Sequence, residues 1–303
     1  MRADPGAGRW LVTGAAGMLG RDVLTVLGDA GIEAIGLGHP DLDVTDPAAV
    51  RAAVEGIAVV VNCAAWTDVD GAETAEAAAT AVNGTGVRIL AEACGDAGAR
   101  LLHVSTDYVL PGDADHPYDE DAATGPVNAY GRSKLIGEHA VAELLPKDGY
   151  VVRTAWMYGE HGPNFVATML KLAAQRDTLD VVDDQHGQPT WSYVLAGRLV
   201  ELGLAALEGR APGGVYHGTA SGQTTWMGLA REAYRLSGLD PERIRPTSSA
   251  AFVRPAVRPA FSVLGHDRWA EAGLEPLADW REQLAAAIVR PAFADLLRSP
   301  SQG

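Results

Sequence analysis

The sequence predicts an α/β protein whose first half is a doubly wound parallel sheet and whose second half is a smaller unit. Short apolar runs rich in β-branched residues alternate with helical patterns up to residue 154. A glycine-rich turn joins the first run to the first helix. Beyond residue 154 the alternation weakens, and proline-rich connections separate shorter elements.

The alternation starts with an apolar run at 10–13, a helical pattern between Leu19 and Leu27, and a second run at 33–37. This is the strand–helix–strand spacing of a parallel sheet. Further strands are expected at 58–62, 101–105 and 150–154, with helices at 73–98 and 128–145. Continuous apolar strands separated by helices indicate a sheet that is covered on both faces.

The second half contains expected helices at 164–175 and 191–207 and short segments at 181–184 and 214–218. We expect the helix 191–207 to return to the first unit. The expected division is 1–155 plus 191–210 for the first unit and 156–190 plus 211–303 for the second. The second unit then covers the carboxyl ends of the strands, where ligands bind in such sheets.

Composition narrows the function classes. The 303 residues are 47% hydrophobic and 21% charged, and no apolar run approaches the ~20 residues that span a bilayer. The N-terminal stretch lacks an apolar signal core, so we expect a cytoplasmic protein. Cys63 and Cys94 lack a C-x-x-C pattern, which argues against a disulfide scaffold or a zinc site. The net charge of −15 argues against nucleic acid but not against an anionic small molecule.

Gly14, Gly17 and Gly20 form a G-x-x-G-x-x-G turn between the first strand and the first helix. Glycine there allows positive φ and close approach of the backbone to a pyrophosphate, which then lies at the helix N-terminus. The alternative is a tight turn without a ligand. The position of the turn favours a nicotinamide dinucleotide.

The end of the second strand bears on which dinucleotide is used. An acid at that point commonly bonds the ribose hydroxyls of NADH. Here Gly38 and His39 stand at the strand end, with Asp41 and Asp43 further on. The lack of a carboxylate directly at the strand end favours NADPH, with NADH tolerated.

Tyr130 and Lys134 stand four residues apart in the expected helix 128–145, which places them on one face. A free phenol has a pKa of ~10, and a fixed ammonium nearby would lower it. This pair therefore predicts a proton donor to a carbonyl that receives a hydride. The alternative is an exposed tyrosine beside a solvated lysine.

A hydroxyl group at the end of the strand 101–105 would hold that carbonyl. Thr106 is the candidate, and Ser105 competes with it because either hydroxyl could face the site. The constellation uses no metal. No residue pattern indicates Mg²⁺, although the sequence leaves a Mg²⁺ requirement open, as it does the choice between monomer and homodimer.

These motifs together resemble the extended short-chain dehydrogenases/reductases, and more specifically the dTDP-4-dehydrorhamnose reductase family. The resemblance is carried by GMLGRD (17–22), VNCAAWTDVDGAE (61–73), STDYV (105–109), YGRSK (130–134), RTAWMYG (153–159) and VVDDQHGQPTW (181–191). It covers residues 9 to 290 approximately. It implies a Rossmann fold with a smaller C-terminal domain that binds a nucleotide sugar.

The resemblance also implies roles by position. It implies that Tyr130 is the proton donor, that Lys134 also bonds the nicotinamide ribose, and that Thr106 tunes the tyrosine. Implied cofactor contacts are Gly14, Gly17, Met18, Leu19, Asp43, Val44, Ala64, Ala65 and Trp66, together with Tyr130 and Lys134. Implied substrate contacts are Thr106, Asp107 and Trp156. Leu110 departs from the family, which often has Phe there, and the missing strand-two acid leaves the cofactor preference in doubt.

Other polar residues keep two interpretations each. Asn164 either binds the sugar or caps a helix. Arg254 and Arg258 either bond a dTDP diphosphate or lie on the surface. Asn83 either holds a water or the backbone of the site, or caps a bend at Gly84 and Gly86. His186, His217 and Cys63 are expected to be structural.

The predicted function is NAD(P)H-dependent reduction of the C4 carbonyl of a dTDP-linked 4-keto-6-deoxysugar, which gives dTDP-L-rhamnose. A dTDP-dihydrostreptose synthase or another antibiotic deoxysugar 4-ketoreductase is the alternative within this class. A non-catalytic dinucleotide-binding regulatory subunit, similar to those of methionine adenosyltransferase, is the alternative from another class. An epimerase or dehydratase is disfavoured, since dehydratases add an acidic pair after the threonine and only Asp107 follows Thr106 here.

Overall fold

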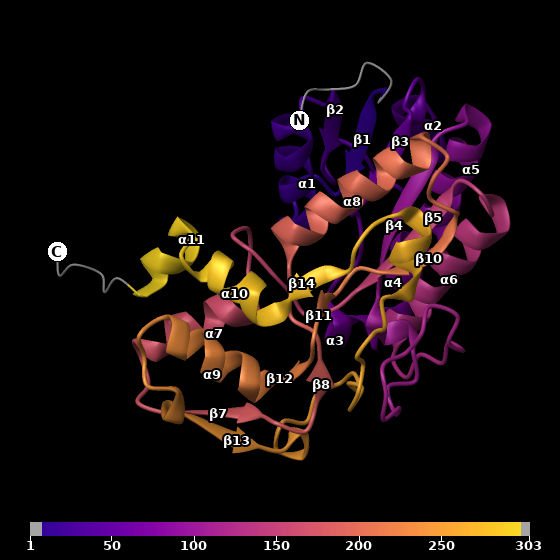
Figure 1. The fold of residues 1–303 in the computed structure, drawn as a ribbon. Coiled ribbons are helices and arrows are strands. Elements are labelled where there is room, and N and C mark those ends of the chain that lie inside the picture. Colours follow the sequence, from indigo (N-terminus) through magenta and orange to yellow (C-terminus); the bar gives the residue numbers. More distant parts are fainter. Residues whose placement is uncertain (1–7, 298–303) are drawn as a thin grey trace.

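The computed structural model describes residues 8–297, and its centre is a six-stranded sheet in which every strand pair is parallel (Figure 1). The strand order is β10-β5-β4-β3-β1-β2. The strands are β1 (Trp10–Thr13), β2 (Ala34–Leu37), β3 (Val59–Asn62), β4 (Arg100–Thr106), β5 (Gly149–Thr154) and β10 (Gly214–His217). The order in which successive strands are added to the sheet reverses between β3 and β1. This arrangement confirms the predicted fold class.

Helices cover both faces of the sheet. One face carries α1 (Met18–Asp29) and α8 (Ser192–Leu207), which lie against each other (Figure 1). The other face carries α2 (Pro47–Val54), α5 (Val87–Ala97) and α6 (Ala129–Leu144). Helix α2 was not expected from the sequence; Asp46 caps its N-terminus ahead of a proline at the first position. Among the described residues, no helix is long and apolar enough to cross a membrane.

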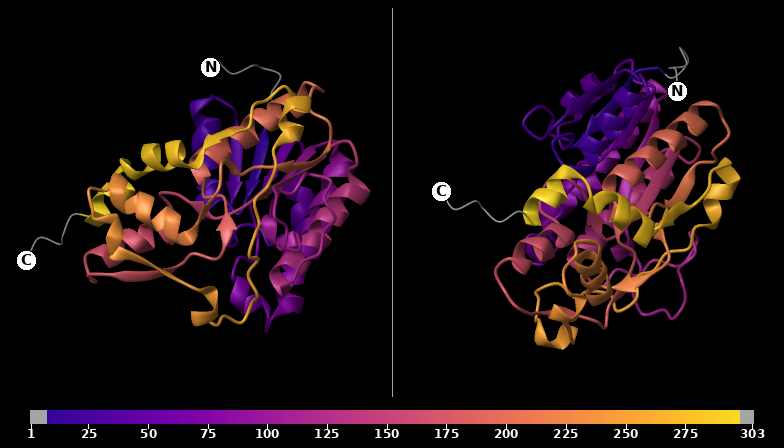
Figure 2. Two further views of the ribbon diagram at one scale, coloured as in Figure 1. Left: turned by 60° about the horizontal axis from the view of Figure 1, so that its bottom comes forward. Right: turned by 60° about the vertical axis from the view of Figure 1, so that its left-hand side comes forward.

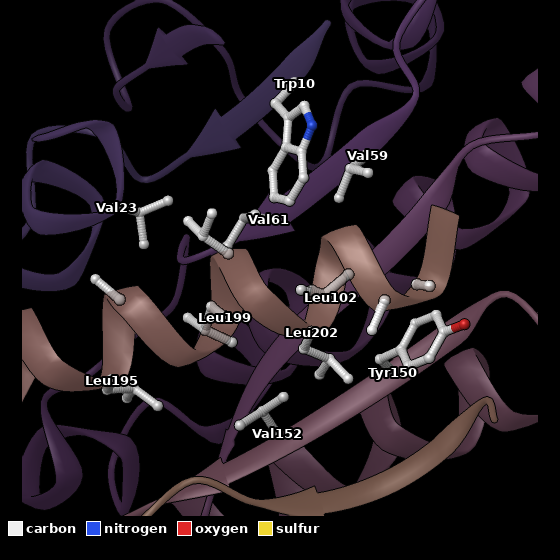
Figure 3. Packing of buried hydrophobic residues seen from close by; sticks show 14 of the residues in the cluster. Trp10, Val23, Val59, Val61, Leu102, Tyr150, Val152, Leu195, Leu199 and Leu202 are labelled. Carbon is white, nitrogen blue, oxygen red and sulfur yellow. The ribbon is translucent and has the colours of Figure 1, made fainter. Parts of the chain in front are cut away.

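Side-chain alternation along the strands divides the core into two layers. Trp10 and Val12 of β1 point to the α1 and α8 side, whereas Leu11 points to the α2 and α5 side. Figure 3 shows the first layer, in which Leu195 and Leu199 of α8 lie one helical turn apart over the sheet. The two layers hold the strands rigidly, so that their carboxyl ends are a fixed platform.

The predicted helix over 73–98 is wrong in its details. The structure has α3 (Val69–Ala72), α4 (Glu76–Thr80), a π-helical turn η1 (Ala81–Gly86) and then α5. Gly84 and Gly86 lie inside η1, packed so closely against Ile136 and Val44 that a Cβ atom would sit 2.7 and 2.9 Å from their side chains. The tight packing of this segment against α6 explains the bulge better than local helix propensity does.

The second unit consists of short strand pairs and four helices (Figure 2). The helices are α7 (Phe165–Ala173), α9 (Trp226–Leu236), α10 (Trp280–Ile288) and α11 (Pro291–Ala294). The strand pairs are β7 (Leu179–Val182) with β13 (Ile244–Thr247), β6 (Met157–Tyr158) with β9 (Thr190–Trp191), β8 (His186–Gly187) with β12 (Thr224–Thr225), and β11 (Ala220–Ser221) with β14 (Leu277–Asp279). Short 3-10 segments in the chain as a whole are η2 (Asp107–Val109) in the first unit, and η3 (Pro241–Arg243), η4 (Ser249–Ala251), η5 (Asp267–Ala272) and η6 (Asp295–Leu297) after α9.

The expected division at residue 210 does not follow the sheet. Strand β10 pairs with β5 in the central sheet, although the sequence places it in the second unit. Tyr216 of β10 and Trp269 of η5 belong to the same core layer as α8. The chain therefore crosses back to the first unit more than once after α8.

Shortening a core side chain of α8 tests this layer. Leu199 is fully buried, so Leu199→Ala should lower the free energy of unfolding by about 2–5 kcal/mol through lost burial and a residual cavity. Val289 is 72% exposed, and Val289→Ala should change the free energy of unfolding by about 0.5 kcal/mol or less. Urea unfolding curves measure both, and equal effects would contradict the packing.

Candidate active site

The glycine turn lies directly after β1, beside the point where the strand order reverses. Gly14 has φ of 63°, and a Cβ there would lie 2.6 Å from the Ala64 amide nitrogen. A Cβ on Gly20 would lie 2.4 Å from the Gly14 carbonyl oxygen. Any side chain at either position would therefore open the turn. Gly17 precedes α1, whose N-terminal amides are available to an anion.

The other predicted cofactor residues surround this turn but differ in what they offer. Met18 is half-buried, whereas Leu19 and Val44 are buried in the core, so only their backbones can meet a ligand. Asp43 is exposed and accepts hydrogen bonds from the amide and hydroxyl of Thr45. Those bonds lower the pKa of the Asp43 carboxyl.

The loop that follows β3 holds the remaining predicted cofactor residues, Ala64, Ala65 and Trp66. All three are half-buried. The Ala64 amide lies beside Gly14, so this loop packs directly against the glycine turn.

The end of β2 differs from the sequence expectation. Asp41 folds back, and its Oδ2 accepts a hydrogen bond of 3.0 Å from the Gly38 amide. A carboxylate thus stands at the strand end although no acid occupies that position in the sequence. The premise that favoured NADPH, a strand end free of negative charge, is wrong.

The two hydroxyls that competed at the end of β4 point to different partners. Ser105 donates to Glu138 Oε1 at 2.6 Å. The Glu138 carboxylate also accepts hydrogen bonds from the Arg153 guanidinium. Thr106 lies close enough to the Tyr130 phenol to act on its pKa, which it lowers. Ser105 therefore serves the packing of α6, and Thr106 lies beside the phenol.

Asp107 follows immediately and is buried at 3% exposure. Its Oδ1 accepts the Thr106 hydroxyl at 3.0 Å. Burial raises the pKa of the Asp107 carboxyl to about 6, although its hydrogen bond with Thr106 partly offsets the shift. The raised pKa makes Asp107 a stronger base than an ordinary carboxylate, and its Oδ1 holds the Thr106 hydroxyl in this structure.

Tyr130 lies in the first turn of α6. Asn128 caps that helix by accepting the Gly131 amide at 2.8 Å and donates to Val257 O at 2.9 Å. The ring of Tyr108 meets the Tyr130 ring edge-on, with centroids 6.0 Å apart. Burial, reinforced by the negative charge of Asp107, raises the pKa of the Tyr130 phenol. This is opposite to the lowering expected from the sequence.

Lys134 is almost completely buried, with 2% exposure. Its Nζ donates to Val104 O at 2.7 Å and lies 3.4 Å from His103 Nε2. Burial lowers the pKa of Lys134 to about 8, against the opposing pull of Glu138. The lysine is therefore docked on β4.

Asn83 links the loop after β3 to α6, an arrangement that the sequence left open. Its Oδ1 accepts the Trp66 amide at 2.8 Å, and its Nδ2 donates to Trp66 O and to Ser133 Oγ. Ser133 in turn donates to Tyr130 O at 2.7 Å. Both Asn128 and Ser133 were missed from the sequence; Asn128 carried a signal, since Asn before a helical run is a common cap.

Trp156 stands at the entrance to the second unit in a strained conformation. Its φ is 45°, the one positive value among the described non-glycine residues. Its ring stacks on Trp226 with centroids 3.6 Å apart, and it lies close against Gly187, where a Cβ would be 2.5 Å away. Strain of this kind persists where surrounding contacts enforce it and is common at binding sites.

Arg258 and Asn164, both predicted to bind substrate, have partners within the chain. Arg258 forms a two-pronged ion pair with Asp70 of α3, at 2.5 and 2.9 Å. The Arg258 hydrogen bond holds the pKa of Asp70 at about 2. Asn164 caps α7 through the Ala167 amide and donates to Gly159 O. The capping interpretation of Asn164 thus matches the structure, and Arg254 lies exposed, 3.5 Å from Asp70.

The remaining candidates behave as structural groups. Burial lowers the pKa of His217 to about 3 and raises that of Cys63 to about 12, so neither is a reactive acid or nucleophile near neutral pH. His186 is exposed on β8. Within residues 8–297, no cluster of three or more His, Cys, Asp or Glu side chains is arranged to hold a metal.

The burial of Asp107 predicts a pH-dependent stability. Because its folded pKa of about 6 lies above the ordinary value, wild-type protein loses stability relative to Asp107→Asn as pH rises from about 4 to about 6. The difference should change by on the order of 2 kcal/mol. Urea unfolding of both proteins at pH 4, 5, 6 and 7 measures it, and a constant difference would refute the burial of a titrating carboxyl.

Comparison with known proteins places this geometry in a family. Residues 8–292 match the family model described as the RmlD substrate binding domain. A dTDP-4-dehydrorhamnose reductase of Streptomyces griseus is 57% identical over 97% of both chains. A dTDP-4-keto-6-deoxy-D-glucose reductase of Streptomyces niveus is 50% identical over 92% of this chain and 96% of its own.

A solved structure agrees with these sequence relatives. The dTDP-4-dehydrorhamnose reductase of Bacillus anthracis, in complex with NADP, has a TM-score of 0.88 at 33% identity. The match covers 93% of this chain and 99% of that one. Since the family model spans nearly the whole described chain, the protein belongs to the RmlD substrate binding domain family.

Proposed function

We propose that the protein reduces the C4 carbonyl of a dTDP-linked 4-keto-6-deoxysugar with a nicotinamide dinucleotide. The observation that carries this proposal is the placement of Thr106, at the carboxyl end of β4, beside the Tyr130 phenol, with Lys134 one turn along α6. The names of the relatives, which are reductases of such sugars, support the substrate class.

Each site residue has a role in this reaction. The dinucleotide, when bound, supplies the hydride to the carbonyl carbon. Thr106 turns its hydroxyl from Asp107 to the carbonyl oxygen, and Tyr130 gives that oxygen its proton as the C=O electron pair moves onto it. The raised pKa keeps the Tyr130 phenol protonated across the neutral range, which suits an acid in the reductive direction. Lys134 supports Tyr130 from the same helix face.

We propose NADPH as the preferred dinucleotide, since the related Bacillus anthracis structure contains NADP. Arg21 supports this, because it projects from the first turns of α1 and is exposed, with its Nε bonded to Ala16 O in the glycine turn. A guanidinium there can accompany a 2′-phosphate. Asp41 opposes it through its charge at the end of β2. The ratio of kcat/KM for NADPH and NADH, measured in wild type and in Asp41→Asn, separates these contributions.

The sugar itself is a finer question, because the named relatives act on different keto sugars. We propose dTDP-4-dehydrorhamnose as substrate, with dTDP-L-rhamnose as product. Incubation with this compound or with dTDP-4-keto-6-deoxyglucose, followed by NMR of each product, identifies the sugar. If neither compound supports NADPH oxidation, another dTDP-linked keto sugar is favoured as substrate. If no keto sugar supports it, a binding subunit without catalysis is favoured.

Removal of the Tyr130 hydroxyl is the direct mutational test. Tyr130→Phe should lower kcat by about 10²–10⁴-fold, the contribution of a positioned general acid, while the Kd for NADPH changes little. Tyr234→Phe is the matched control, since its hydroxyl bonds Met169 O in the second unit and should leave kcat nearly unchanged. NADPH oxidation and fluorescence titration measure the two quantities, and full turnover by Tyr130→Phe would refute the assignment.

A further inference from the structure

A row of buried polar side chains runs under the active site and has no role in the proposed reaction. Thr13 of β1, Asn62 of β3 and His103 of β4 have exposures of 1% or less. They lie side by side on three neighbouring strands. The row ends at Lys134, which is why its hydrogen-bond directions matter for the site.

The first step is the orientation of Asn62. Its Oδ1 accepts the Ala64 amide at 3.2 Å and the Thr13 hydroxyl at 2.6 Å. The Ala64 N–H can only donate, so a flipped Asn62 would set an NH₂ group against it. The Asn62 amide is therefore held with its Nδ2 towards His103 Nδ1, 3.0 Å away.

The second step is the tautomer of His103. Because Asn62 Nδ2 is a donor, His103 Nδ1 must accept and carries no proton. Burial, and then the charge of Lys134, lower the pKa of His103 well below its ordinary value, so the ring is neutral. Its one proton is on Nε2, and that N–H faces Lys134 Nζ at 3.4 Å.

We propose that Asn62 and His103 act as positioning residues. Asn62 holds His103 in its Nε2–H form, and this N–H is a donor to Lys134 that stabilises the neutral amine. An amine accepts the Nε2–H through its lone pair and still donates to Val104 O. If Lys134 were an ammonium, one of its N–H groups would face the His103 Nε2–H, and two donors would meet without an acceptor.

The surroundings of Lys134 agree with this assignment. It forms no ion pair with any side chain of the described part of the chain. Glu138, on the next turn of α6, is occupied by Arg153 and Ser105, and Cys63 at the end of β3 is a neutral thiol. The Tyr130 phenol is neutral too. An ammonium in this place is therefore buried without a counter-charge, which is costly. The lowered Lys134 pKa of about 8 is consistent with it.

The consequence for turnover rests on the proposed function. A Lys134 ammonium favours the phenolate that Tyr130 becomes when it gives its proton to the sugar oxygen. The neutral amine that His103 stabilises gives no such help. Reduction should then slow as pH rises through the pKa of Lys134.

The wild-type protein supplies the first test. Long-range ¹H–¹⁵N NMR of the histidine ring, with and without NADPH, should show the proton of His103 on Nε2. Assignment follows from the signal lost in His103→Asn. A proton on Nδ1, or a doubly protonated ring, would overturn the proposal whether or not the protein reduces a sugar.

Lysine titration supplies the second test, helped by the small number of lysines. Labelling with [¹³Cε]lysine gives three signals, from Lys134 and from the exposed Lys147 and Lys171, which are internal references in the same spectrum. His103→Asn keeps an acceptor for Asn62 and removes the Nε2–H without adding charge. Lys134 should then bind its proton about tenfold more tightly, one pKa unit.

Asn62→Asp should reverse the tautomer of His103. Its carboxylate accepts from Ala64, from Thr13 and from His103 Nδ1–H, so the ring proton should move to Nδ1 and the Lys134 pKa should rise again. The lysine signal needs no catalysis, so failure here is distinct from failure of the proposed function. An unchanged Lys134 titration in both folded variants would refute the proposal.

Discussion

The burial of Lys134 against β4 is the contact on which the arrangement of the site depends. The lysine reaches from the second turn of α6 to Val104 O in the middle of a central strand. This contact sets the height of α6 on the sheet, and with it the position of Tyr130 one turn earlier. Asn128 at the cap and Asn83 on η1 hold the same helix from two other sides. The phenol is thus placed by a rigid frame, as a proton donor requires.

Burial also decides the charges in the site. A tyrosine beside an ammonium would have a lowered pKa in water, but here loss of hydration raises the pKa of Tyr130 and lowers that of Lys134. The result is a protonated phenol next to a lysine that can lose its proton near neutral pH. For a reductase that must deliver a proton, a phenol kept neutral is the useful state.

The sequence predicted the features that depend on local pattern. The parallel sheet, the glycine turn and the placement of Thr106 and Tyr130 near each other follow from strand–helix alternation and from helical spacing. It did not predict the return of Asp41 to Gly38, the ion pair of Arg258 with Asp70, or the stacking of Trp156 on Trp226. The last two join residues 188 and 70 positions apart (258 − 70 and 226 − 156), and such contacts are set by how the two units pack. The π-turn at Ala81–Gly86 likewise results from packing against α6 and not from the alanine-rich sequence around it.

The most direct measurement is a crystal structure of the protein with NADP⁺ and the dTDP-linked sugar alcohol that the reaction would form. The account predicts that the C4 oxygen of the sugar accepts hydrogen bonds from Tyr130 Oη and Thr106 Oγ1, with the nicotinamide ring facing the same carbon. A complex in which the Tyr130 hydroxyl is remote from both ligands would contradict it.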